Sequence, residues 1–206
     1  MRPKTDIKLL LNVVFALALG VLFGNFLGNK IITEETLGVV ADIYENEVYL
    51  IRTGQFSTEL DAQVHKANLQ KLGVESVIVK EYTKYFVYHE ISNKEDFDHL
   101  TDLFDEQQID YFIKERVLFN LIKKFGIDEN DEDLMKEYDF YFETISYYLS
   151  MLNGITVTFS DEYLSQINDE NMNLFNHLNT LNSNLHTELN NRYELLVYKS
   201  LAEILM

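Results

Sequence analysis

The side chains that could perform chemistry in this chain are carboxylates and histidines, because its 206 residues include no cysteine. No two histidines have the i, i+4 spacing of a helical zinc pair. The sequence also lacks the Gly-x-Ser-x-Gly pattern of a nucleophile elbow. The residues therefore predict neither a catalytic site nor a metal site, and no cofactor is expected.

Residues 128–133 form an acidic run that resembles the start of a calcium-binding EF-hand loop. Counted from the first of these residues, the sixth position holds Asp133 rather than glycine, and the twelfth holds Asp139 rather than glutamate. We interpret the run as an acidic first turn that favours a helix dipole. Asp98 and Asp102 lie on a predicted solvated helix face, so a cell-wall hydrolase is a hypothesis without a supporting motif.

The whole chain is strongly acidic, with 34 acidic residues, 17 basic residues and a formal net charge of −17. A surface of this charge repels a phosphate backbone. No nucleic-acid partner is therefore predicted, although RNA-recognition modules share the strand order described below.

The elements that would position any site begin after an apolar N-terminal segment. Residues 9–28 carry no charge, and a helix of that length is about 30 Å long, enough to cross a bilayer. Three basic residues precede the segment: Arg2, Lys4 and Lys8. The positive-inside rule then predicts a single-pass anchor in the cytoplasmic membrane, with a cytoplasmic N-terminus and extracytoplasmic C-terminal domains. A signal peptide cleaved after Ala16-Leu17-Ala18 is the alternative.

Small residues recur every four positions within this segment, and we predict that they form a transmembrane dimerisation stripe. The stripe comprises Ala16, Gly20, Gly24 and Gly28. The alternative is that glycine is simply common in membrane helices. Residues 31–46, which follow, are predicted to be a linker.

The middle of the chain predicts the order β-α-β-β-α-β, the split arrangement of ferredoxin-like folds. The predicted ranges are a strand at 48–55, a helix at 58–73, strands at 74–82 and 84–91, a helix at 94–108 and a strand at 109–115. Such a module has one antiparallel sheet, with both helices on one face and the other face free.

Several segments of this module resemble the sporulation-related repeat, or SPOR, domain. They are YLIRTGQF at 49–56, Ala62, the helix end from Leu69 to Gly73, and YFVY at 85–88. The resemblance covers residues 46–116 and implies binding to peptidoglycan glycan strands stripped of stem peptides, at bacterial division sites. The chain departs from the family pattern at Arg52, Gln55, Phe86 and Glu90, where the family usually has glutamine, serine or alanine, a basic residue, and glycine.

Strand alternation places Tyr49, Ile51 and Thr53 on the helix-covered face, and Leu50 and Arg52 on the free face. The resemblance to SPOR domains supplies the ligand, and the strand alternation supplies the face that would bind it. Together they predict a glycan-binding surface composed of Leu50, Arg52, Gln55, Phe86, Tyr88, Phe112 and Lys114. The alternative is that these aromatic residues pack against the C-terminal helices instead.

The predicted domains are the cytoplasmic tip and anchor (1–30), the linker (31–46), a SPOR-like domain (47–116) and a helical bundle or hairpin (117–206). The expected fold class is therefore α+β, with an N-terminal transmembrane helix, a ferredoxin-like domain and a C-terminal helical region.

The expected function is that of a non-enzymatic, membrane-anchored peptidoglycan-binding protein of the division septum or of sporulation. The resemblance implies glycan strands as partners, and divisome proteins could bind the C-terminal helices. The alternative is a membrane-anchored interaction scaffold whose SPOR-like domain no longer binds glycan. Solvent exposure of the predicted sheet surface distinguishes these two hypotheses.

Overall fold

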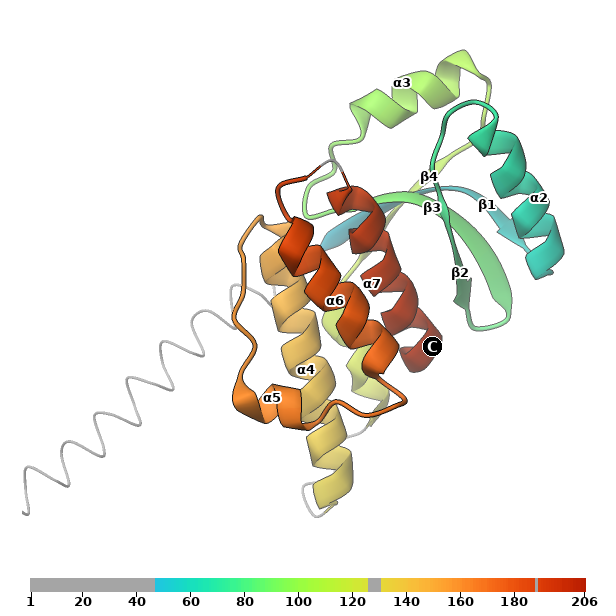
Figure 1. The fold of residues 1–206 in the computed structure, drawn as a ribbon. Coiled ribbons are helices and arrows are strands. Elements are labelled where there is room, and N and C mark those ends of the chain that lie inside the picture. Colours follow the sequence, from blue (N-terminus) through green and yellow to red (C-terminus); the bar gives the residue numbers. More distant parts are fainter. Residues whose placement is uncertain (1–46, 126–130, 188) are drawn as a thin grey trace, which may run out of the picture. The chain divides into compact units, whose positions relative to one another are not determined.

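The structure, a computed structural model, describes residues 47–125, 131–187 and 189–206. Figure 1 shows the arrangement of its strands and helices. In chain order these elements are β1 (Val48–Phe56), α2 (Glu59–Gln70), β2 (Val77–Glu81), β3 (Lys84–Ser92), α3 (Asp98–Glu106), β4 (Phe112–Arg116), the 3-10 helix η1 (Leu118–Phe125), α4 (Glu132–Leu152), α5 (Asp161–Ser165), α6 (Met172–Asn184) and α7 (Asn190–Leu205).

The four strands form one antiparallel sheet with the order β2-β3-β1-β4. This is the strand order of the ferredoxin-like split arrangement, and the element order of residues 47–116 agrees with the predicted one. The pairing of β1 with β3 shifts register between Ile51 and Arg52, and again between Arg52 and Gln55. Such irregularities increase the local twist of a sheet and redirect side chains.

Helices α2 and α3 cover one face of the sheet, where the core of this module lies. Thr58 caps α2, because its Oγ1 accepts a hydrogen bond from the Asp61 N–H. Beyond the helix, Gly73 has a φ of +79°, the left-handed conformation that commonly ends a helix. The buried residues that pack together are Ile51, Ala62, Leu69, Val74, Ile78, Val87, Phe97 and Phe104.

A hydrogen-bonded chain crosses this helix-covered face. The carbonyl of Glu75 can only accept, so Nδ1 of His89 donates to it at 3.0 Å. Burial lowers the pKa of His89 to about 4, so Nε2 of the neutral ring accepts from the Thr53 hydroxyl at 2.8 Å. His65 Nε2 in turn donates to Thr53 Oγ1 at 3.0 Å. Thr53 thus faces the helices, as strand alternation predicted, and His65 and His89 have structural partners in this chain of hydrogen bonds.

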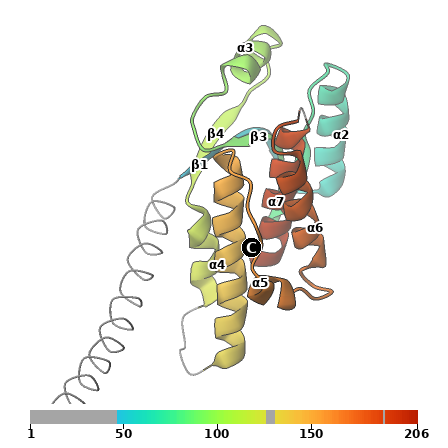
Figure 2. The ribbon, with the colours of Figure 1, turned by 60° about the vertical axis from the view of Figure 1, so that its left-hand side comes forward.

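The opposite face of the sheet is not free, which corrects the expectation above. Helix α7 packs against β2 and β3 on this face, and α6 packs on α7, as Figures 1 and 2 show. The helix buries an apolar side at helical spacing, composed of Leu195, Tyr198, Leu201, Ala202 and Leu205. The predicted C-terminal helices are therefore present, but one of them packs on the sheet.

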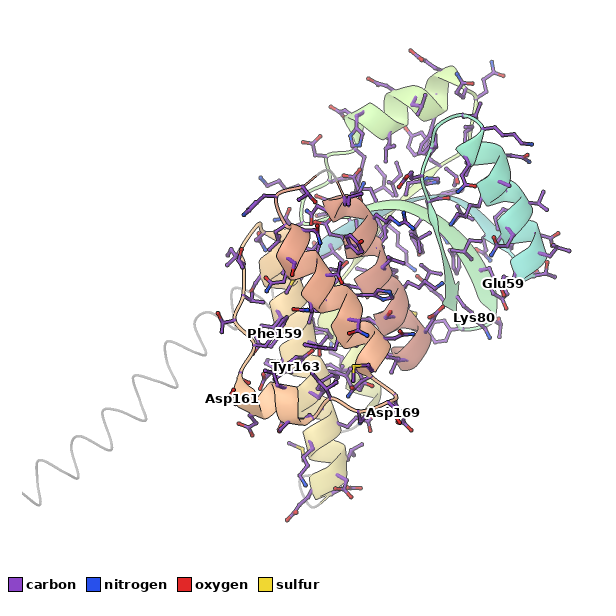
Figure 3. The ribbon with its side chains drawn as sticks, in the orientation of Figure 1. Glu59, Lys80, Phe159, Asp161, Tyr163 and Asp169 are labelled. Atoms are coloured by element: carbon purple, nitrogen blue, oxygen red, sulfur yellow. The ribbon has the colours of Figure 1, made fainter. Side chains whose placement is uncertain are left out.

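Aromatic residues form the core between α4, α5 and the segment that joins them. The rings of Phe140 and Tyr163 stack with centroids 4.9 Å apart, and Tyr163 also stacks on Phe159 at 5.7 Å. Figure 3 shows Phe159 and Tyr163 pointing into this cluster. The Tyr163 hydroxyl lies 3.0 Å from Thr144 Oγ1, which satisfies its polar end inside the cluster.

The predicted fold class is corrected with respect to the membrane. Within residues 47–125, 131–187 and 189–206, no helix combines the length and the apolar character that a bilayer crossing requires. The part of the chain that the structure describes is α+β, with a four-stranded antiparallel sheet and helices. The segment 9–28 and the stripe of Ala16, Gly20, Gly24 and Gly28 lie outside the described residues.

Candidate functional site

The seven residues of the predicted glycan surface fall into two groups. Leu50, Phe86 and Tyr88 are buried on the face that α7 covers. Arg52 and Lys114 are half-buried. Gln55 is exposed, and Phe112 retains 59% of its surface. Three of the seven predicted residues are thus buried, and the other four remain at least partly accessible.

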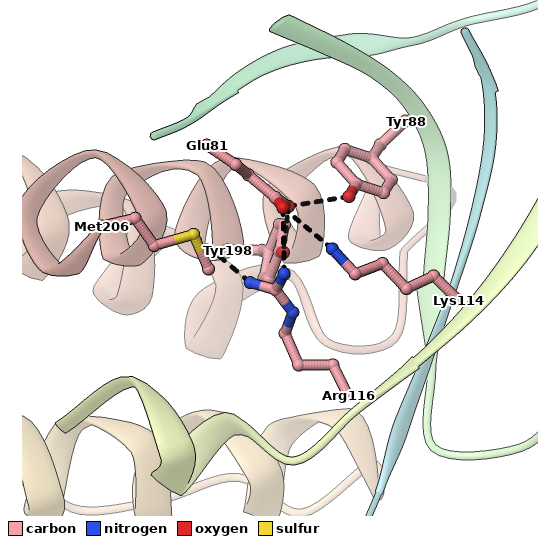
Figure 4. Close-up of polar contacts among 6 residues, drawn as sticks. All are labelled: Glu81, Tyr88, Lys114, Arg116, Tyr198 and Met206. Carbon is pink, nitrogen blue, oxygen red and sulfur yellow. Dashed lines mark hydrogen bonds and ion pairs between the residues drawn. The ribbon is translucent and has the colours of Figure 1, made fainter. Parts of the chain in front are cut away.

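A buried carboxylate joins α7 to the sheet (Figure 4). Glu81 Oε1 accepts hydrogen bonds from the hydroxyls of Tyr88 at 2.7 Å and Tyr198 at 2.6 Å. Its Oε2 accepts from Lys114 Nζ and Arg116 Nη2, both at 2.9 Å. The four donors come from β3, β4 and α7, so a single side chain of β2 links these elements.

The charges of this cluster are fixed by its geometry. Burial alone would raise the pKa of Glu81, but hydrogen bonds from Tyr198, Lys114 and Tyr88 and the charge of Arg116 outweigh it and lower the pKa to about 2. Burial and the adjacent carboxylate raise the pKa of Tyr88, so its hydroxyl remains a donor. The cluster therefore keeps one protonation state across the neutral range and acts as a structural link.

The accessible end of the sheet face combines cations with aromatic rings. The Arg52 guanidinium carbon lies 4.5 Å from the Phe86 ring centroid and 5.7 Å from that of Phe112. Lys114 Nζ lies 5.7 Å from the Phe86 ring. Nε and Nη1 of Arg52 are buried and have no hydrogen-bond partner among the described residues. We call Arg52, Gln55, Phe112 and Lys114 the open strip.

A groove of about 810 Å³ runs along β2 between α2 and α7. Figure 1 shows β2 between these two helices, and Figure 3 shows Glu59 and Lys80 at one end of the groove. Lys66 lies on the α2 wall, and Arg192 and Lys199 lie on the α7 wall. Burial lowers the pKa of Lys66, and the charges of Lys199 and Arg192 lower it further.

The other end of the groove holds a contact between a histidine and a carboxylate. His99 Nε2 lies 3.0 Å from Glu90 Oε2, and Asn191 donates to the same oxygen at 3.3 Å. Behind them, Glu194 is buried and accepts a hydrogen bond from Asn190 at 2.8 Å. Burial, followed by the charge of Glu90, raises the pKa of Glu194 to about 7. Glu194 does not line the groove, so this unusual carboxyl is not presented to a ligand.

Reasoning from the sequence missed most of the residues that matter here. The missed residues are Glu81, Arg116 and Tyr198 of the buried cluster, and Lys66, Arg192 and Lys199 of the groove. Glu81 did carry a signal, because it has the same parity as Val77 and Val79 in an apolar strand. A carboxylate at an inward position is rarely buried without a charged partner. The groove cations carried no such signal.

Metal chemistry finds no support in the geometry. Within the described ranges, no group of three or more histidine, aspartate or glutamate side chains is arranged to hold a metal ion. Half of the acidic run considered for calcium, residues 128–130, lies outside those ranges. In the described half, Asp131 caps α4 by accepting a hydrogen bond from the Leu134 N–H, and Glu132 and Asp133 lie in the first turn of that helix.

Comparison with known protein families, with curated proteins and with solved structures gives no match to this chain. The resemblance to SPOR domains therefore remains a prediction based on the residues quoted above.

Proposed function

We propose that this protein is a non-catalytic interaction module that binds a partner protein. The observation that carries the proposal is the packing of α7 against β2 and β3, on the sheet face where Leu50, Phe86 and Tyr88 are buried. Bonds from Tyr198, Lys114 and Arg116 to Glu81 hold that face closed. The groove along β2 is left as an open concave surface, and surfaces of this kind recognise polypeptides.

The state of the titratable groups supports a role without catalysis. The carboxylate of Glu81 is held by four donors, and His89 is held by Thr53 and the Glu75 carbonyl. Catalytic sites combine shifted pKa values with access to substrate. Here the strongly shifted groups are buried behind structural partners.

Photo-crosslinking in the native cell tests the proposal. A benzoylphenylalanine is placed at Leu189, which lines the groove and is 52% exposed, or at Phe112 of the open strip. Met172, an exposed residue of α6 that lines neither surface, is the control position. We expect a discrete protein adduct from at least one test position and none from the control. The adduct partner is then purified and its binding to the full-length chain measured by calorimetry.

The absence of adducts from both test positions would contradict the proposal. So would an adduct whose purified partner shows no binding to the full-length chain.

A second candidate function is glycan binding at the open strip. It is favoured by the exposure of Phe112 and Gln55, since an aromatic ring for stacking and an amide that donates hydrogen bonds are what sugars require. The test is sedimentation of the full-length chain with purified peptidoglycan, before and after an amidase removes the stem peptides. We expect the same low retention in both samples, because the buried residues cannot reach a glycan strand.

The sedimentation is repeated with Arg52→Glu, and with Lys136→Glu on α4 as a control of equal charge change. Retention that rises on stripping and falls only in Arg52→Glu would establish the glycan function in place of the proposed one.

A further inference from the structure

Three of the 17 basic residues of this acidic chain gather on the sheet face that carries the open strip. Arg52, Lys114 and Arg116 belong to the paired strands β1 and β4 and have the same parity in the sheet. Glu81 bonds Lys114 and Arg116, and it already accepts four hydrogen bonds. Arg52 forms no ion pair within the part of the chain that the structure describes. Three cations thus share one carboxylate near β4, although the chain has a net charge of −17.

These positive charges act on one another. Burial lowers the pKa of Lys114, and the charges of Arg116 and Arg52 lower it further, while Glu81 opposes them. Glu115 on β4 has the opposite parity and lies across from Tyr49, so it points away from the cations. An added negative charge on this face would therefore relieve repulsion among the cations.

Strand β4 forms an open edge of the sheet. It pairs only with β1 among the described strands, and none of its five residues is buried. The other edge strand, β2, has four buried residues out of five. Phe112 and Ile113 point to opposite faces of β4 and are 59% and 36% exposed. The outer edge of β4 therefore presents apolar surface together with unpaired backbone groups.

The charges of β4 determine which strand could pair with this edge. Cations on an edge strand disfavour pairing with a second copy, because like charges would meet across the new strand pair. The same cations favour a strand with acidic side chains on that face. The side chains of Lys114 and Arg116 are 30% and 13% exposed and stay bonded to Glu81, so they supply charge while the backbone of β4 supplies hydrogen bonds.

We propose that the outer edge of β4 binds an extended acidic segment of the partner protein as an added strand. This inference rests on the proposed function and gives the partner its chemistry and its site. Side chains of an added strand alternate between the two faces of the sheet. Acidic side chains therefore lie beside Lys114 and Arg52, and the intervening apolar side chains lie beside Ile113.

Fluorescence anisotropy with the full-length chain tests the charge recognition. The probe is a labelled octapeptide of alternating valine and glutamate, compared with the same peptide carrying glutamine or lysine in place of glutamate. We expect the glutamate peptide to bind at least tenfold more tightly than the glutamine peptide, with binding that weakens as salt rises. The lysine peptide should not bind. Equal binding of the glutamate and glutamine peptides would overturn the proposed charge recognition.

A substitution on β4 identifies the site. Phe112→Glu places a carboxylate of the chain itself beside the cations, at an exposed position outside the Glu81 cluster. It should weaken binding of the glutamate peptide at least tenfold. The control is Leu164→Glu on α5, which changes an exposed apolar residue with the same change of charge and should leave affinity unchanged. Equal losses in both variants would overturn the proposed site, because they would reflect net charge alone.

Hydrogen exchange with the unmodified chain identifies the mode of binding, and it does not depend on how a variant folds. The glutamate peptide should slow exchange of the amides of residues 112–116 that face the outer edge. It should leave the amides of residues 77–81 unchanged. Binding without protection of β4 would overturn strand addition.

The inference and the proposed function can fail separately. If no peptide binds at millimolar concentration while the crosslinked partner does, the inference fails and the proposed function stands. Retention on peptidoglycan or a concentration-dependent dimer, without peptide binding, would also overturn the inference and would assign the edge to a glycan strand or a second copy. If neither peptide nor partner binds, both proposals fail.

Discussion

Replacement of Glu81 by glutamine should lower the free energy of unfolding by about 3 kcal/mol at pH 7. A pKa held at about 2, rather than the ordinary 4.5, corresponds to a stabilisation of about that size. The amide keeps the shape of the side chain but removes the charge that Lys114 and Arg116 face. Removing one partner of a buried ion pair typically costs about 3–5 kcal/mol, because the remaining charges stay desolvated.

The pH dependence of this loss follows from the direction of the shift. The folded-state pKa of Glu81 lies below the unfolded value, so its contribution is complete above about pH 4.5 and is lost as the pH falls towards 2. Urea unfolding of wild type and Glu81→Gln at pH 7 and at pH 2.5 measures the difference. The difference in free energy of unfolding between wild type and Glu81→Gln should be large at pH 7 and much smaller at pH 2.5. A loss of equal size at both would show that the effect is steric.

Glu115→Gln provides the control for this experiment. Glu115 lies on β4 beside Lys114, but its side chain is exposed. A surface substitution of this kind changes stability by about 0.5 kcal/mol or less. A comparable loss in both variants would contradict the assignment of the effect to the buried cluster.

The sequence was informative about which face each strand residue occupies, but not about what covers that face. Alternation placed Ile51 and Thr53 towards α2 and α3, and the structure agrees. The same alternation placed Leu50 and Tyr88 on the opposite face, where an apolar and aromatic surface suits either a sugar or a helix. The spacing of apolar residues in α7 predicts a buried side. It does not reveal that this side packs on a sheet formed far earlier in the chain.

The groove could not be predicted for a related reason. Lys66 and Arg192 are distant in sequence, and each belongs to a helix of which one side is solvated. Charged residues on such helices usually contact water, so neither stands out alone. Only the tertiary packing of α7 beside β2 brings them to opposite walls of one groove. Glu81 differs, because a carboxylate among the valines of β2 is improbable unless it is paired inside the protein.

Glu194→Gln should stabilise the protein at alkaline pH, whereas Glu81→Gln should destabilise it at neutral pH. Burial and the charge of Glu90 raise the pKa of Glu194 to about 7, above its ordinary 4.5. The folded state therefore favours the protonated carboxyl, so stability is complete below about pH 4.5 and declines as the pH rises through 7. The free energy of unfolding of wild type should fall by about 3 kcal/mol over this pH range. Glutamine stays neutral, and its carbonyl can still accept from Asn190.

Urea unfolding at pH 4.5 and at pH 8 measures this gain. The free energy of unfolding of the variant should equal that of wild type at pH 4.5 and exceed it by about 3 kcal/mol at pH 8. Glu203→Gln on the same helix is the matched control, because Glu203 is exposed and its ion pair with Lys199 contributes little. A variant less stable than wild type at pH 8 would mean that the Glu194 carboxylate is compensated by a favourable partner. Stabilisation at pH 8 alone would identify Glu194 as a buried group whose charge destabilises the folded protein.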